Sequence, residues 1–304
     1  GTHAIVRGRV ATGAVTVIDS TGEGTYVYLG TARPIETPYL TAIVDPGMPE
    51  WLRQMFERRL PELFAAYAKE FGVALPWKPV VLYSFHDTAS TGYSSGGGTL
   101  TGLINMTLTG SAWKTPSPDA LVQAFYLLAH ESAHLWNGQL VESAGGPGSS
   151  MDEGSADAMA NEMLLAFGMI DRRGWLRRRE NALNQCAAQV RSASVHGAAE
   201  RGAFKTFYDC GFVLALWTES AIRQQRPDAT IFSFWRDLVA AAGAQNHRSD
   251  EPTWFGVMRS TAAANTVAAA MRSFLEANAI DTAISGMRGA GMNVGRGAGS
   301  PPIA

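Results

Sequence analysis

Hydrophobic and polar residues follow two different periods along the chain, and the change of period separates a β-rich first part from a helical second part. Over residues 4–29, branched and aromatic residues alternate with Gly and Thr, which predicts short antiparallel strands. Apolar runs at 79–85 and 100–108 predict two more strands, with a flexible Gly-rich approach between them. Apolar residues at helical spacing predict a helix over 51–71, which Pro61 should kink or divide. The strands together predict a mixed sheet.

Beyond residue 116 the periodic segments have helical spacing. Residues 117–119 (Ser-Pro-Asp) supply an N-cap, a first-turn proline and an acid, so a helix should begin here and run to about Asn137, where Gly138 can end it. A second helix should begin near Ser149, which lies three residues before an acid, as in a capping box. Further helices are expected over 173–192, 204–224, 231–242 and 262–277.

These elements predict an α+β fold, with a small twisted mixed sheet and its helices followed by an all-helical lobe. We expect a β-rich N-terminal segment at 1–46, an α/β lobe at 47–170 and a helical lobe at 171–284. The remaining segment, 285–304, is rich in Gly and Pro and predicts a poorly packed, flexible tail.

Composition excludes several classes of function. With 304 residues, 46% hydrophobic and 17% charged, the chain can bury a substantial core, so disorder of the whole chain is excluded. A net charge of −2 without a basic stripe gives no support for a nucleic-acid partner. The longest apolar stretches, such as Cys210–Trp217, are shorter than the roughly 18 residues that span a bilayer.

The two cysteines, Cys186 and Cys210, are too few for a disulfide scaffold or a thiolate metal site. They can form one bridge or remain buried thiols, and composition does not choose between the two. If they are paired, the compartment is oxidising, and we expect a bacterial periplasmic or secreted location.

One motif in the helix that begins near residue 117 carries metal chemistry. It reads His130-Glu131-Ser132-Ala133-His134, which is the pattern HExxH. Side chains four residues apart lie on the same face of a helix, so both imidazoles can bind one ion. Neutral imidazole is a good zinc ligand, and Glu131 can act as general base toward a metal-bound water. The motif therefore predicts a site for one Zn²⁺ ion.

A third ligand is available at the start of the next helix. Eighteen residues lie between His134 and Glu153, whose carboxylate would complete a His-His-Glu set. Three protein ligands leave one position open for water, as in a catalytic zinc site. Asp157, one turn further, could accept the free ring N–H of a ligating His. Taken alone, the two acids are better explained as an ordinary acidic first turn that is stabilised by the helix dipole.

The residues around this motif resemble a known family. LAHESAHLWNGQLV at 128–141 closely resembles the zinc helix of the aminopeptidase N-like gluzincins, HExxHxWxGxxV, and MDEGSA at 151–156 resembles their NEGFA segment. The eighteen-residue gap matches that family too. FYDCGFVLALW at 207–217 is similar to their YxKG helix, with Tyr208 and the Gly kept and Asp209 in place of Lys.

The resemblance implies a thermolysin-like catalytic unit that cleaves a peptide or protein substrate, without the family's large N-terminal β domain. It also implies that Tyr208 stabilises the oxyanion of the transition state. Family members that remove N-terminal residues carry GxMEN on an edge strand, and its Glu binds the substrate amine. The corresponding residues here are Gly102, Leu103, Ile104 and Asn105, with Asn105 at the Glu position. We expect this strand to pair with the substrate backbone but to lack the ion pair with a free amine.

Two other interpretations remain open. The chain could be a zinc- or peptide-binding module that keeps the metal site but does not turn over substrate, or a hydrolase of a non-peptide substrate such as an epoxide. The presence of both Glu131 and Tyr208 favours the peptidase over the binding module.

Overall fold

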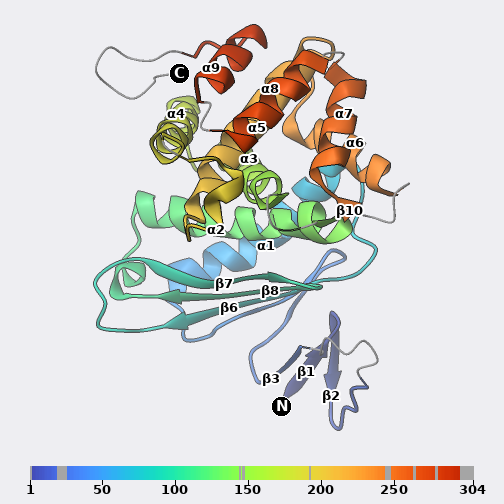
Figure 1. Ribbon diagram of the computed structural model, residues 1–304. Coiled ribbons are helices and arrows are strands. Elements are labelled where there is room, and N and C mark those ends of the chain that lie inside the picture. Colours follow the sequence, from blue (N-terminus) through green and yellow to red (C-terminus); the bar gives the residue numbers. More distant parts are fainter. Residues whose placement is uncertain are drawn as a thin grey trace. The chain divides into compact units, whose positions relative to one another are not determined.

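The computed structural model shows a mixed α+β protein, as the sequence predicts (Figure 1). Its internal contacts divide the chain into two units, residues 1–135 and 136–304. No described helix is both long and apolar enough to cross a membrane. The structure describes residues 2–18, 26–143, 145, 148–191, 193–243, 248–262, 265–277 and 280–294.

A five-stranded mixed sheet forms the centre of the first unit, with strand order β4-β5-β6-β8-β7. β5, β6 and β8 are parallel neighbours, whereas β4 and β7 pair antiparallel at the two edges. Two expected strands are confirmed as β6 and β8, but the expected flexible Gly-rich approach is itself a strand, β7. Its glycines pair through main-chain hydrogen bonds, which need no side chains. The bounds are β4 Ile35–Glu36, β5 Thr41–Val44, β6 Val80–His86, β7 Ser94–Leu100 and β8 Leu103–Thr109.

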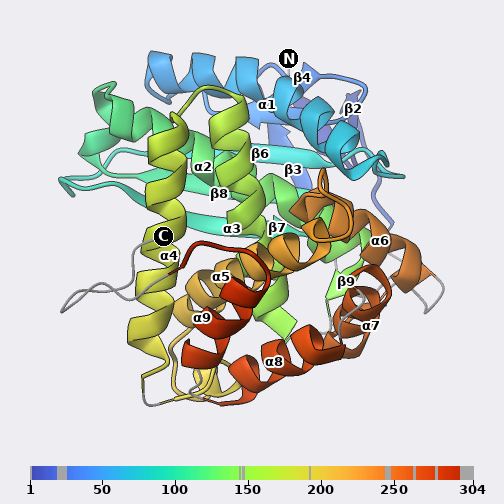
Figure 2. The ribbon, with the colours of Figure 1, turned by 90° about the horizontal axis from the view of Figure 1, so that it is seen from above.

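Two helices, α1 (Glu50–Phe71) and α2 (Pro118–His134), cover one face of this sheet (Figures 1 and 2). The ring of Phe56 on α1 stacks on Tyr83 of β6, with centroids 4.1 Å apart. α1 is a single helix through Pro61, because buried apolar residues on both sides of the proline hold it against the core. The expected division of this helix is therefore wrong.

A small antiparallel sheet packs on the opposite face of the five-stranded sheet within the same unit. It has the order β2-β1-β3, with β1 His3–Val6, β2 Arg9–Thr12 and β3 Val27–Gly30. Side chains alternate between faces along a strand, so residues such as Val80 and Leu103 point away from the helices. They form an apolar cluster with Ile5 of β1. The expected strands at the start of the chain are confirmed in these three segments.

The second unit is almost entirely helical, and α5 is its centre, with contacts to α3, α4, α6, α7 and α9. A disulfide between Cys186 and Cys210 joins α4 to α5, which settles the choice that composition left open. The short strands β9 (Glu142–Ser143) and β10 (Arg248–Ser249) pair in parallel. The helices are α3 Ser149–Ala166, α4 Arg172–Gln189, α5 Lys205–Arg223, α6 Ile231–Gly243, α7 Glu251–Ala262, α8 Asn265–Glu276 and α9 Ile280–Gly289.

Several helix boundaries differ from the sequence prediction. The helix expected over 262–277 is α8, and α7, which precedes it, is a helix that the sequence did not predict. α9 continues into the segment expected to be a flexible tail, because Ile280, Ile284 and Met287 form a buried stripe at helical spacing. The part of that tail beyond residue 294 lies outside the described residues. α3 begins at Ser149 itself, with no side-chain cap, so the expected capping box is wrong.

Candidate metal centre

The start of α2 has the expected cap, which fixes the direction of the helix that carries the HExxH motif. The Ser117 hydroxyl accepts a hydrogen bond from the Ala120 N–H at 3.0 Å, and Pro118 is the first helical residue. Such a cap contributes about 1 kcal/mol to helix stability. The α-helix ends at His134 and a π-helical turn, Leu135–Leu140, follows, so it does not extend to Asn137 as expected.

The two histidines of the motif point toward one another. Nε2 of His130 lies 3.1 Å from Nε2 of His134. Two nitrogens bound to one tetrahedral zinc at about 2.05 Å would lie about 3.3 Å apart, so this spacing fits two ligands of a single ion. His130 is buried and His134 is half-buried, which limits the freedom of both rings.

The carboxylate of Glu131 contacts a side chain that the sequence analysis missed. Oγ1 of Thr99, on edge strand β7, lies 2.9 Å from Oε2 of Glu131 and 2.8 Å from its main-chain oxygen. A threonine directly after three glycines gives no functional signal in a sequence. Thr99 reaches α2 because β7 pairs with β8, and such pairing depends on residues that are distant along the chain.

In the second unit, two glycines allow α3 and α5 to cross with their main chains in contact. A Cβ atom built on Gly154 would lie 1.9 Å from the carbonyl carbon of Gly211, and one built on Gly211 would lie 1.9 Å from the Ser150 carbonyl oxygen. Glu153 directly precedes the first glycine, and Tyr208 lies one turn before the second. The crossing therefore fixes the segments that carry the third candidate ligand and the candidate phenol.

Asp209, which stands where the resembling motif YxKG has Lys, is held by two side-chain hydrogen bonds. Asp209 is buried, and its Oδ2 accepts hydrogen bonds from Lys205 Nζ and Gln189 Nε2, both at 2.7 Å. Because Gln189 lies on α4, this contact ties α4 to α5 beside the disulfide. The Asp209 carboxylate thus has a structural role, because it links α4 to α5.

His130, His134 and Glu153 form a group that could hold a metal ion, with ligand atoms all within 4.8 Å of one another. Two imidazole nitrogens and one carboxylate oxygen are a donor set that zinc accepts. Asp157 lies one turn after Glu153 on α3 and is half-buried. Its proposed contact with a ligating His stays a prediction.

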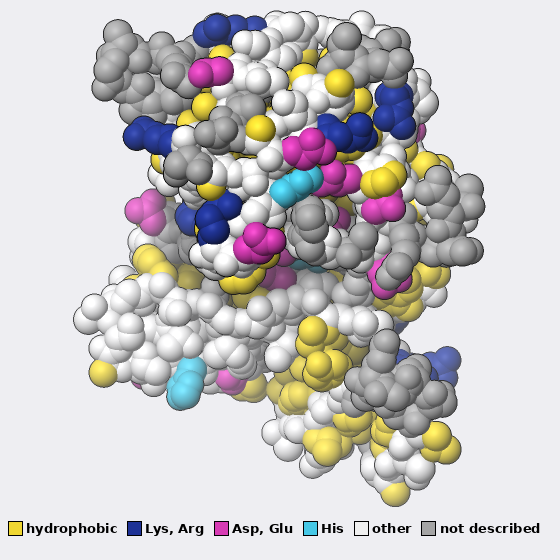
Figure 3. Space-filling view, in the orientation of Figure 1, with side chains coloured by type: hydrophobic (Ala, Val, Ile, Leu, Met, Phe, Trp, Pro, Cys, Tyr) yellow, Lys and Arg dark blue, Asp and Glu magenta, His cyan; other side chains and the backbone are white. Residues whose placement is uncertain are grey.

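The predicted substrate strand is not at the edge of the sheet. Leu103, Ile104 and Asn105 belong to β8, which pairs with β6 on one side and with β7 on the other, and Gly102 lies in the turn before it. Both main-chain edges of β8 are therefore occupied, and the expectation that it pairs with a substrate backbone is wrong. The edge on this side is β7. Figure 3 shows the surface in the region of β7 and β8 largely white, with few charged or apolar side chains.

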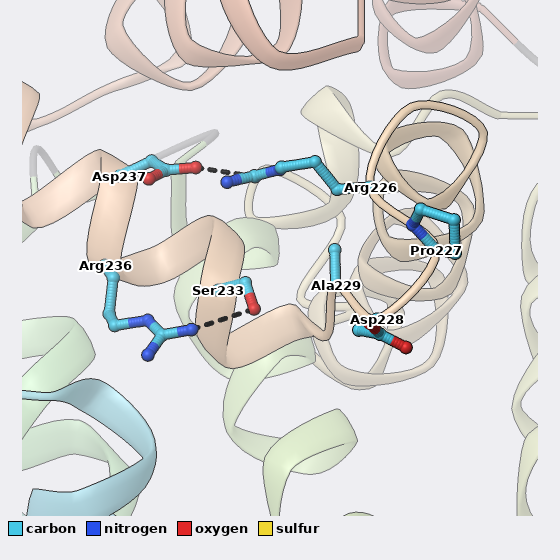
Figure 4. Close-up of a pocket in the computed structure, with 7 residues that line it drawn as sticks. All are labelled: Arg226, Pro227, Asp228, Ala229, Ser233, Arg236 and Asp237. Atoms are coloured by element: carbon cyan, nitrogen blue, oxygen red, sulfur yellow. Dashed lines mark hydrogen bonds and ion pairs between the residues drawn. The ribbon is translucent and has the colours of Figure 1, made fainter.

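A cavity of about 510 Å³ lies at the corner between α5 and α6 (Figure 4). Four of its lining side chains are paired with one another: Arg226 binds Asp237 at 2.6 Å, and Arg236 donates to the Ser233 hydroxyl at 3.0 Å. None of the predicted site residues lines it. This cavity is therefore separate from the candidate metal centre.

Comparison by sequence finds no counterpart: no protein-family model and no curated protein matches the chain. Comparison by structure finds an aminopeptidase N family protein and M1 zinc metallopeptidases. An aminopeptidase N family protein from Idiomarina loihiensis matches with a TM-score of 0.68 at 12% identity, over 91% of this chain and 53% of the other.

An M1 zinc metallopeptidase from Deinococcus radiodurans matches with a TM-score of 0.57 at 16% identity, over 91% of this chain and 62% of the other. A mutant of an M1 zinc metallopeptidase from that organism, bound to a Tyr-Ser-Ala substrate, gives 0.56 at 16% identity, over 91% and 61%. This chain thus spans between 53% and 62% of the length of these proteins. The likeness establishes a shared fold.

Proposed function

We propose that this protein is a zinc-dependent peptidase. The observation that carries the proposal is the pair of imidazole nitrogens 3.1 Å apart on α2, with the Glu131 carboxylate between them in sequence. The fold, which resembles that of zinc metallopeptidases, supports the same conclusion.

In this proposal His130, His134 and Glu153 hold one Zn²⁺ ion. When bound, zinc supplies a Lewis acid that polarises the scissile carbonyl and acidifies a water. Glu131 takes the proton from the attacking water and returns it to the leaving amine. Tyr208 donates a hydrogen bond to the oxyanion. Asp157 accepts the free ring N–H of a ligating His and so fixes its tautomer.

The test combines zinc stoichiometry with hydrolysis of a mixed peptide library by the intact protein. We expect about one zinc per chain and cleaved peptides, whose termini distinguish exopeptidase from endopeptidase activity. Bound zinc without cleavage of any peptide would contradict the proposal and favour a binding module. Turnover of an epoxide but of no peptide would favour the non-peptide hydrolase.

Replacing Tyr208 by Phe should lower kcat by about 10² to 10³, the effect of removing one oxyanion donor. KM and zinc content should change little, because the phenol acts mainly in the transition state. Steady-state kinetics on a cleaved library peptide measure both constants. Tyr39→Phe, at an exposed tyrosine of the first unit, is the control. A kcat for Tyr208→Phe within about threefold of wild type would reduce Tyr208 to a packing residue.

N-acetylated peptides should be cleaved about as fast as the same peptides with a free amine. The edge strand β7 (SSGGGTL) and its neighbour β8 (LINMTLT) carry no Asp or Glu, so neither supplies an ion-pair partner for an α-ammonium group. Matched free and acetylated peptides, compared by kcat/KM, test this. A preference of more than roughly tenfold, or about 1.4 kcal/mol, for the free amine would overturn it and indicate a true aminopeptidase.

We also propose an extracytoplasmic location, periplasmic or secreted. The disulfide between Cys186 and Cys210 supports it, because such bonds persist in oxidising compartments. An alkylating reagent applied to an extract denatured without reductant should then leave both cysteines unmodified, because the disulfide and not burial protects them. Alkylation without reductant would argue against this location.

A further inference from the structure

We propose that Thr99 is a positioning residue for Glu131. This inference rests on the proposed function, because it gives Thr99 its role through the general base. The Thr99 hydroxyl contacts Glu131 twice, at Oε2 (2.9 Å) and at the main-chain oxygen (2.8 Å). Both residues lie in the first unit, Thr99 on β7 and Glu131 on α2.

The glycine at position 97 lets edge strand β7 approach β8 closely, and this pairing sets which face Thr99 occupies. Gly97 has a φ of 119°, and a Cβ atom there would lie 1.9 Å from the Asn105 carbonyl oxygen. Only glycine fits this position without displacing β8. Thr99 pairs with the fully buried Ile104 of β8, so its side chain points to the helix-covered face. The local main chain thus delivers one hydroxyl to Glu131.

The contact restricts the oxygen on which the proposed mechanism depends. A glutamate side chain has several rotatable bonds, and fixing it in one geometry costs conformational entropy. Threonine is β-branched and has few side-chain conformations of its own, so it is a rigid partner. With Oε2 held by Thr99, Oε1 is the oxygen left to meet the water. Such positioning acts on the chemical step, and small displacements of a reacting group lower kcat strongly.

A purely structural role is the competing explanation. The Thr99 hydroxyl has one hydrogen, and both Glu131 oxygens are acceptors, so the hydrogen is shared between the carboxylate and the main-chain oxygen. The share donated to the main-chain oxygen ties β7 to α2 whatever the Glu131 side chain does. The bond to Oε2 is the one that serves positioning. A readout that depends on the Glu131 side chain therefore distinguishes positioning from a purely structural tie.

The first test is kinetic. Thr99→Val keeps the shape of the side chain and removes the hydroxyl, and we expect kcat to fall by about 10- to 100-fold, with KM within about threefold and unchanged zinc content. Thr99→Ser, which keeps the hydroxyl, should restore kcat to within about threefold of wild type. The matched control is Thr107→Val, because the Thr107 hydroxyl pairs with Ser84 Oγ at 2.8 Å on the same sheet. It should leave kcat unchanged.

A kcat for Thr99→Val within about threefold of wild type would overturn the inference. So would an equal loss of kcat in Thr107→Val, because the effect would then be a general weakening of the sheet. If the wild-type protein cleaves no substrate at all, the proposed function has failed, and that outcome is separate from either of these.

The second test needs neither zinc nor activity. Thermal unfolding of the metal-free protein is compared for wild type, Thr99→Val, Glu131→Ala and the double variant. If Thr99 binds the carboxylate, Thr99→Val should lower Tm less in the Glu131→Ala background than in wild type. We expect the two losses of Tm to differ by about 1 to 3 °C. Equal losses of Tm in both backgrounds would show that the hydroxyl serves only the main chain, which would overturn the inference.

Discussion

The zinc content of a Glu131→Gln variant should equal that of the wild type, whereas its kcat should fall by about 10² to 10⁴, the usual contribution of a positioned general base. Glutamine has nearly the same shape and can still meet the Thr99 hydroxyl with its amide oxygen, so the local structure should persist. It cannot accept a proton from water. Metal analysis of the purified variant, together with steady-state kinetics, measures both quantities.

The control for this experiment is Glu36→Gln, at an exposed position of edge strand β4 in the same unit. It changes the net charge by the same amount and should leave kcat unaffected. Loss of zinc from Glu131→Gln would show that Glu131 supports the metal site itself. Wild-type activity would remove it from the mechanism.

His130→Ala and His134→Ala should each abolish both zinc binding and hydrolysis. Their Nε2 atoms lie 3.1 Å apart, and the loss of either one removes a ligand from a set of three. Two protein ligands do not make the usual catalytic zinc site. Zinc content should fall from about one per chain to near zero, as measured after dialysis against a metal-free buffer.

Two further variants make this experiment specific. His86→Ala removes an exposed histidine at the end of β6 and should retain zinc and activity. Glu153→Ala tests the third ligand and should lose zinc as the two histidine variants do. Full zinc occupancy in His130→Ala, His134→Ala or Glu153→Ala would refute the assignment of that residue as a zinc ligand.

The parts of the site that the sequence predicts are those set by neighbours along the chain. The cap at Ser117 and the facing pair His130 and His134 depend only on helical geometry, and both are present. The cap residues act within one turn, so they can be identified without knowledge of the rest of the fold. The same is true of the apolar stripe that defines α1.

The errors concern features that depend on contacts between distant segments. Whether β8 lies at the centre or at an edge of the sheet depends on where β7 pairs, and a strand with three glycines has no apolar alternation to reveal it. The contact of Thr99 with Glu131 follows from that pairing and was missed for the same reason. The π-helical turn after α2 is a similar case, because the Asn137 side chain donates to the Asp152 carbonyl at 2.8 Å, a contact fifteen residues away.

The crossing of α3 and α5 has a consequence for how far such a chain can diverge. The contact between Gly154 and Gly211 is made by main-chain atoms, which are the same in every amino acid. It restricts two positions and leaves the other side chains of both helices free to change in compensating sets. Extensive drift in sequence is therefore compatible with an unchanged crossing as long as both glycines remain.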